Sequence, residues 1–100
     1  MKNSAVFKAV AEPRRVELLQ HLRDQGEMSV GDLADRVDVT QQAVSLHLKV
    51  LEEAGLVGAR REGTRHLYSI NTDGFQPIGD FLQAFWGEKL KALKRGIEKK

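Results

Sequence analysis

The chain has 100 residues, 41% hydrophobic and 30% charged, a composition typical of one small globular domain. The net charge of +2 does not by itself indicate a nucleic-acid-binding protein, and the absence of cysteine excludes disulfides, thiolate metal sites and thiol redox chemistry. No apolar run approaches the roughly 20 residues of a membrane span and no signal peptide is recognisable, so we expect a cytoplasmic protein with no membrane partner.

Two helices are predicted at the start of the chain. The first is expected over about Ser4–Ala11, with Asn3 or Ser4 as its N-cap. It ends before Pro13, because proline disfavours helix at the residue that precedes it. The second is expected over about Pro13–Arg23, since proline is well accommodated in a first helical turn. Its buried side chains are predicted to be Val16, Leu18, Leu19 and Leu22.

Two further helices follow, separated by a tight turn at residues 37–40. The third opens at Ser29, where Asp32 completes a pattern that resembles a capping box. Its inward side chains are predicted to be Leu33, Ala34 and Val37. The fourth spans Gln41–Ala54, capped by Thr40 and stopped by Gly55. Its inward side chains recur at helical spacing: Val44, Leu48 and Leu51.

A hairpin and a long helix complete the prediction. Strand-like runs at Leu56–Arg61 and Thr64–Ile70 are joined through Glu62-Gly63. One helix is then expected over Gly74–Glu98, with a length of about 35 Å. Its apolar residues recur every three or four positions: Phe75, Ile78, Leu82, Phe85, Trp86, Leu90, Leu93 and Ile97. So small a domain cannot cover this helix, which indicates a dimer interface.

The order of these elements predicts a mainly α fold with a β-hairpin wing, a winged helix-turn-helix in a single domain over residues 1–100. The helix-turn-helix covers about 30–54, the wing about 56–70 and the final helix about 74–98. Opposite its apolar face, the fourth helix presents Thr40, Gln41, Gln42, Ser45 and Lys49, and amide and hydroxyl groups there can reach base edges. Arg60, Arg61 and Arg65 bracket the wing tip. Both features also fit a simply solvated helix face and a protected sheet edge.

Four stretches of the chain resemble the ArsR/SmtB family of bacterial winged-helix repressors: residues 7–19, 33–34, 44–57 and 61–70. The most specific part is Ser45-Leu46-His47-Leu48 followed by Ala54-Gly55-Leu56-Val57. The resemblance implies a homodimer with its first and last helices at the interface. It also implies a repressor that binds an inverted-repeat operator, so double-stranded DNA and a second copy of the chain are the expected partners.

The resemblance places Gln41, Gln42, Ser45 and Leu46 at the major groove, although polar residues are frequent in the family where this chain has Leu46. We expect His47 to be half-buried and hydrogen-bonded rather than in contact with a base. The predicted DNA-binding residues are Thr40, Gln41, Gln42, Ser45, Leu46, Lys49, Arg61 and Arg65. The predicted dimerisation residues are Phe7, Val10, Ile78, Leu82, Phe85, Trp86 and Leu93.

The sequence favours a regulator without a metal or other cofactor. Metal-responsive members of the family carry Glu-Leu-Cys-Val-Cys-Asp-Leu where this chain has Glu27-Met28-Ser29-Val30-Gly31-Asp32-Leu33. Another family site uses aspartate and histidine on the last helix, which here has no histidine. The aromatic side chains of that helix are expected to form core or dimer interface, or else to line a pocket at the dimer interface for an unknown apolar small-molecule effector: Phe75, Phe81, Phe85 and Trp86.

An enzyme is not expected. Ser45 and His47 are two residues apart on a helix and point in different directions, so they cannot form a nucleophile–base pair. A winged-helix protein-interaction module, acting as a co-repressor or a partner-sequestering dimer, is the alternative. It is kept because residues 40–71 hold only four basic against three acidic side chains. Binding to DNA should weaken steeply with salt, which separates the two functions.

Overall fold

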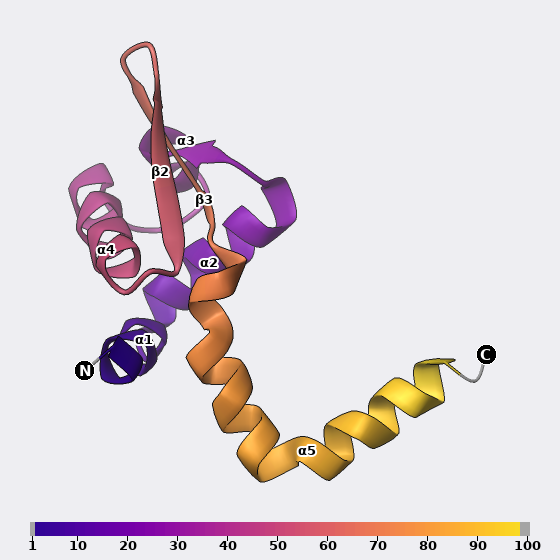
Figure 1. Cartoon of the computed structure of the whole chain (residues 1–100). Helices are drawn as coiled ribbons and strands as arrows, with labels where there is room; N and C mark the ends of the chain where they lie inside the picture. Colours follow the sequence, from indigo (N-terminus) through magenta and orange to yellow (C-terminus); the bar gives the residue numbers. More distant parts are fainter. Residues whose placement is uncertain (1, 99–100) are drawn as a thin grey trace.

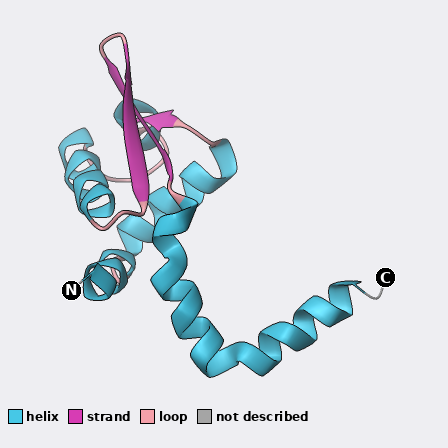
Figure 2. Cartoon of the chain, in the orientation of Figure 1, coloured by secondary structure: helices cyan, strands magenta, loops and turns pink. Residues whose placement is uncertain are grey.

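The computed structural model describes residues 2–98, which form a mainly helical protein with one small sheet (Figures 1 and 2). In chain order the elements are α1 (Lys2–Val10), α2 (Pro13–Gln25), β1 (Met28–Ser29), α3 (Val30–Ala34), α4 (Gln41–Glu53), β2 (Val57–Glu62), β3 (Arg65–Ile70), the 3-10 turn η1 (Thr72–Phe75) and α5 (Gln76–Glu98). Figure 1 shows α1–α4 and the sheet in one body, from which α5 departs below the hairpin. The fold is the predicted winged helix-turn-helix.

The first two helices meet at a corner that proline and glutamate define. Glu12 is the N-cap of α2, and its side chain accepts a hydrogen bond from the backbone N–H three residues later at 3.1 Å. Pro13 occupies the first turn, where a missing N–H costs nothing. The predicted start of α1 is wrong, because the helix already includes Lys2, so Asn3 and Ser4 lie inside it. Packing of its buried face stabilises α1 beyond the expected cap.

The helices of the helix-turn-helix, α3 and α4, begin at side-chain caps. The hydroxyl of Ser29 accepts from the Asp32 N–H at 3.1 Å, and the Asp32 carboxylate accepts from the Ser29 N–H at 3.4 Å. This is the predicted capping box. The Thr40 hydroxyl accepts from the Ala43 N–H at 3.1 Å and caps α4, also as predicted. Gly55 then adopts the left-handed conformation expected of a helix stop, with φ 83°.

The wing belongs to a three-stranded antiparallel sheet with the strand order β1-β3-β2. Strands β2 and β3 pair along their length and leave a two-residue loop at Gly63–Thr64. The sequence predicts the turn one residue earlier, at Glu62-Gly63; Gly63, with φ 64°, instead takes the first loop position. Strand β1 is not predicted, because two residues show no periodicity. Its pairing of Met28 with Tyr68 attaches the wing to the helical body.

The core lies between the helices and the inner face of the sheet. Its largest fully buried side chains are Leu18, Leu22, Leu33, Val44, Leu48, Leu51 and Leu56. Every predicted inward residue of α4 is among them, because the helical spacing of that segment is regular. Val16 is the exception in α2: it is half-buried and lines a surface groove instead of joining the core. The three predicted residues of the third helix all pack inward, although α3 ends before Val37.

The last helix begins later than predicted and mostly leaves the body. Residues 72–75 form η1, and α5 starts at Gln76, since the following Pro77 fits a first turn. A Cβ at Gly74 would collide with the carbonyl oxygen of Gly55, so glycine is required where α5 is joined to the end of α4. Figure 1 shows α5 bent about midway. Within residues 2–98, no helix is long and apolar enough to cross a membrane.

Candidate nucleic-acid interface

Helix α4 divides into a buried face and an exposed face. Val44, Leu48 and Leu51 are completely inaccessible to solvent and lock the helix against the core. The opposite face carries all the predicted contact residues of this helix in exposed positions: Thr40, Gln41, Gln42, Ser45, Leu46 and Lys49. Leu46 also lies on this face and is 66% exposed. The exposed face thus combines hydroxyl, amide and ammonium groups with one leucine side chain.

The exposed face of α4 has the polarity that a nucleic acid requires. Val30, Gln41, Gln42 and Ser45 line a shallow recess at the start of the helix. Backbone N–H groups of the first helical turn lie at the same end and favour an anion. Lys49 adds a positive charge one turn after Ser45. The acidic residues of α4, Glu52 and Glu53, lie at its far end.

His47 occupies the boundary between the two faces of α4. Its side chain is 22% exposed, and its Nδ1 atom lies 3.3 Å from Nη1 of Arg15 on α2. The Glu12 carboxylate lies 3.9 Å from its Nε2 atom. The predicted half-buried, hydrogen-bonded role of His47 is thus confirmed, and the partners are ones that the sequence analysis did not identify.

The wing arginines differ in what they contact. Arg60 donates two hydrogen bonds to the carboxylate of Glu27, at 2.6 and 2.7 Å, and Arg65 contacts Asp32 at 3.1 Å. Both pairs join the wing to the segment that contains β1 and α3. Arg61 instead donates to His66 at 3.0 Å, and among the described residues it has no carboxylate partner. Arg61 is therefore the wing arginine whose charge remains uncompensated.

The two anchoring carboxylates are held in their ionised form. The hydrogen bonds from Arg60 keep the pKa of Glu27 below its ordinary value of 4.5. The pKa of Asp32 is likewise below 3.8, chiefly because of its hydrogen bonds with Ser29 and then because of the nearby Arg65. At neutral pH both acids therefore pair with wing arginines.

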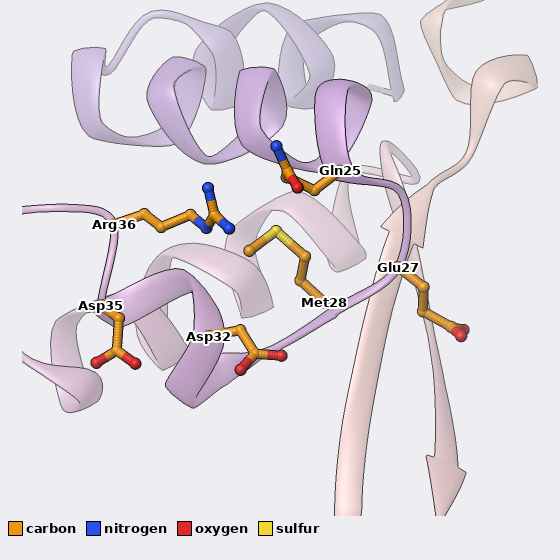
Figure 3. A pocket seen from close by; sticks show the side chains of 6 residues that line it. All are labelled: Gln25, Glu27, Met28, Asp32, Asp35 and Arg36. Carbon is orange, nitrogen blue, oxygen red and sulfur yellow. The ribbon is translucent and has the colours of Figure 1, made fainter.

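A polar pocket of about 300 Å³ lies between the end of α2 and α3 (Figure 3). It is lined by Gln25, Glu27, Met28, Asp32, Asp35 and Arg36. Figure 3 shows its three carboxylates spread around the rim rather than converging on one point. Within the described part of the chain, no three histidine, aspartate or glutamate side chains are grouped closely enough to hold a metal ion.

The apolar stripe of α5 lies largely in solvent. Figure 2 shows the C-terminal part of this helix extending away from the body. Its exposed members are Phe81, Leu82, Phe85, Trp86 and Leu93, and Phe85 is 73% exposed. Phe81 packs edge-on against Phe7 of α1 with ring centroids 5.4 Å apart, and against Phe85 at 4.8 Å. The stripe thus continues onto α1. Ile78, predicted to lie at the dimer interface, packs against the core of its own chain.

The aromatic residues of the C-terminal segment do not gather in one pocket of the protomer. Phe75 lines an apolar groove of about 400 Å³ with Val10, Val16, Leu19 and Ile70, between α2 and the end of β3. Phe81 instead packs on α1, and Trp86 is half-exposed further along α5. The alternative that these residues line an effector pocket at a dimer interface stays a prediction.

The fold and the exposed polar face of α4 together define a winged helix-turn-helix DNA-binding protein. Residues 10–57 match a family model described as a helix-turn-helix domain. The chain is 38% identical to an uncharacterized HTH-type transcriptional regulator of Methanocaldococcus jannaschii over 77% of this chain and 86% of that protein. It is 35% identical to the transcriptional repressor SdpR of Bacillus subtilis, over 71% of this chain and 78% of that one.

A solved structure shares both sequence and fold. It is the homodimeric winged helix-turn-helix DNA-binding domain of Mb0332 from Mycobacterium bovis, described as a possible ArsR-family regulator, with 35% identity and a TM-score of 0.69. The match covers 91% of this chain and 83% of that one. This chain belongs to the ArsR family of helix-turn-helix transcriptional regulators. It is a DNA-binding regulator of transcription, and not an enzyme.

Proposed function

We propose that this protein is a homodimeric transcriptional repressor that binds an inverted-repeat operator and needs no metal ion to do so. The exposed polar face of α4, backed by an apolar face that is completely buried, carries the proposal. A relative that is 35% identical is a repressor, which supports the proposed repression, and a structural relative is a homodimer, which supports the proposed dimer. A two-fold dimer would present two copies of α4 to successive major grooves.

In this proposal α4 is the recognition helix. Gln41 and Gln42 reach base edges, where a glutamine amide can pair bidentately with adenine, and Ser45 fixes the register. Leu46 covers a thymine methyl group, which accounts for its exposure. The Thr40 hydroxyl is already engaged in the helix cap, so Thr40 contributes to the DNA surface mainly by positioning the first turn. Lys49 contacts phosphate.

The wing contributes through two kinds of arginine. Arg61, which lacks a carboxylate partner among the described residues, binds phosphate or the minor groove. Arg65 contacts DNA from its pair with Asp32, and the bidentate pair of Arg60 with Glu27 holds the wing in place. Replacing Arg61 by alanine should therefore reduce the salt dependence of DNA binding by about one phosphate contact.

The dimer is proposed to form through the stripe of α5 and its continuation on α1. Phe85, Trp86 and Leu93 are its principal exposed side chains, with Leu82 beside them. Phe7 and Val10 border this surface on α1 and are half-buried in the protomer. Covering these side chains with a second copy removes them from water, which is the main driving force of association.

Selection of random double-stranded DNA on the purified protein, at two salt concentrations, tests the function. We expect an enriched inverted repeat with half-sites about one helical turn apart. Gln42→Ala should lose most of the enrichment, whereas Gln20→Ala, an exposed glutamine on α2, should retain it. Added chelator should change neither result, and a chelator-sensitive enrichment would contradict the metal-free proposal.

A protein-interaction module is the second candidate function. It is favoured by the pairing of Arg60 and Arg65 with carboxylates, which reduces the positive charge available to phosphates. If that function holds, a properly dimeric preparation should enrich no DNA sequence, and its binding to DNA should depend little on Gln41, Gln42 and Arg61.

A further inference from the structure

We propose that Arg15 is a positioning residue that ties the recognition helix α4 to the C-terminal end of α1. Through this tie the placement of α1, which borders the dimer surface, determines how α4 is presented to DNA. The inference rests on the proposed function, because it concerns how α4 is held for the recognition of an operator.

One side of the Arg15 guanidinium closes the end of α1. Its Nε atom donates to the Ala9 carbonyl at 2.7 Å, and its Nη2 atom donates to the Lys8 carbonyl at 3.2 Å. Both carbonyls belong to the last turn of the helix, which lacks its regular backbone donors. The Lys8 carbonyl also accepts a hydrogen bond from the Ala11 N–H at 3.2 Å, so Arg15 contributes most at the Ala9 carbonyl. Ala9 is completely inaccessible to solvent, so water cannot replace Arg15 there.

The other side of the same guanidinium holds α4. Its Nη1 atom lies 3.3 Å from Nδ1 of His47, which is 32 residues away in the sequence. His47 lies near the middle of α4, between residues of the proposed DNA surface, and Glu12 approaches its other ring nitrogen at 3.9 Å. A planar guanidinium can donate in these three directions at once, whereas a lysine ammonium on a flexible stem cannot do so with the same geometry.

The connection continues from α1 to the surface that the second copy is proposed to cover. Phe7 of α1 packs on Phe81 of α5 at 5.4 Å, and Phe81 packs on the exposed Phe85. A change in the dimer that displaces α1 therefore displaces the carbonyls that Arg15 binds. Reading base edges requires side chains placed within hydrogen-bond reach, whereas binding to the phosphate backbone tolerates displacement. Loss of Arg15 should thus weaken operator binding much more than binding to random DNA.

The test compares Arg15→Met with Arg14→Met in the full dimeric protein, using the operator selected by the wild type and a random-sequence duplex. Arg14 is exposed, and its only side-chain partner among the described residues is Glu17, at 3.2 Å. The two variants therefore lose equal charge at neighbouring positions. Arg15→Met should raise the operator Kd about tenfold, or ~1.4 kcal/mol, and the random-duplex Kd less than about twofold. Arg14→Met should change each less than about twofold, and sedimentation should show dimers throughout.

Substitutions at His47 provide a second test that leaves the bonds to α1 intact, which also serves if Arg15→Met does not fold. His47→Leu removes the acceptor and should weaken operator binding selectively, whereas His47→Asn keeps an acceptor near the position of Nδ1 and should restore it. The double variant Arg15→Met/His47→Leu should be no weaker than Arg15→Met alone, because the two residues act through one contact.

Three results would overturn the inference: equal operator affinity of Arg15→Met and Arg14→Met, a loss by Arg15→Met that is the same on operator and random DNA, or additive effects in the double variant. Failure of the wild type to enrich any DNA sequence would instead overturn the proposed function, so the two failures are distinguishable.

Discussion

The body of the protein and its last helix differ in the burial of their apolar side chains. In the body, leucines from α2, α3 and α4 are hidden from solvent within a single chain. In α5 the large apolar side chains remain exposed, and none of the described side chains of this helix belongs to the fully buried set. The body therefore has the packing of an independent fold, whereas α5 carries an exposed apolar surface, which fits the proposed dimer interface.

The largest effect is expected from a charged residue in the exposed apolar stripe of α5. Phe85→Asp should convert the dimer to monomers and abolish operator binding, because a carboxylate at the interface would be buried without a partner. The circular dichroism of the body should be unchanged, since Phe85 contributes nothing to the core. Lys91→Asp, an exposed change on the same helix, is the control. Retention of the dimer mass by Phe85→Asp in ultracentrifugation would contradict the assignment of the interface.

A change within the body should lower the stability of the fold and leave dimer formation intact. Leu48 is fully buried, so Leu48→Ala should lower the free energy of unfolding by about 2–5 kcal/mol through lost burial and a residual cavity. Urea denaturation of both proteins at the same protein concentration measures this change in the free energy of unfolding. The folded fraction should still sediment as a dimer, and a monomeric folded Leu48→Ala would show that body and interface are not separate.

A change on the DNA surface should affect neither folding nor assembly. Gln42→Ala should weaken operator binding by about 1–3 kcal/mol, the usual contribution of a bidentate base contact. Its thermal midpoint and dimer mass should equal those of the wild type, because the side chain is exposed. Binding isotherms at fixed salt measure the loss, and an equal loss in Gln20→Ala would indicate a nonspecific cause.

The smallest expected effect is the acid response of the wing. Because the pKa values of Glu27 and Asp32 are lowered in the folded protein, their pairs add stability above the ordinary values of 4.5 and 3.8. That contribution is lost as the pH falls through the lowered values. The thermal midpoint of the wild type should therefore decrease from about pH 5 downward, and less so in Glu27→Gln. Identical pH profiles would show that the Arg60 pair does not contribute to stability.

The features that the sequence predicted correctly depend on neighbours along the chain. The caps at Ser29 and Thr40 and the stop at Gly55 are local backbone chemistry, and the buried face of α4 follows from helical spacing. The same spacing predicted that Val16 would be buried, which is wrong, because Val16 is half-buried and lines an open groove with Ile70 and Phe75.

Contacts between distant residues were not predictable from such patterns. The bond from Arg15 to His47 and the pair of Arg60 with Glu27 join positions more than 30 residues apart, and nothing in either segment specifies its partner. Strand β1 was missed for the same reason, since it exists only through its pairing with β3. In the candidate DNA surface, the exposed residues of α4 were predictable from the local pattern. Which of the wing arginines pair with carboxylates was not.

The contact between Gly74 and Gly55 has a mechanical consequence. The Gly55 carbonyl also accepts a hydrogen bond from the Asn71 side chain at 2.8 Å, so the end of α4 and the approach to α5 are fixed at one point. The direction in which α5 leaves the body is therefore set at this point. In the proposed dimer joined through α5, the tilt of α5 would then set the separation of the two copies of α4, and hence the spacing of half-sites that the dimer would fit on DNA.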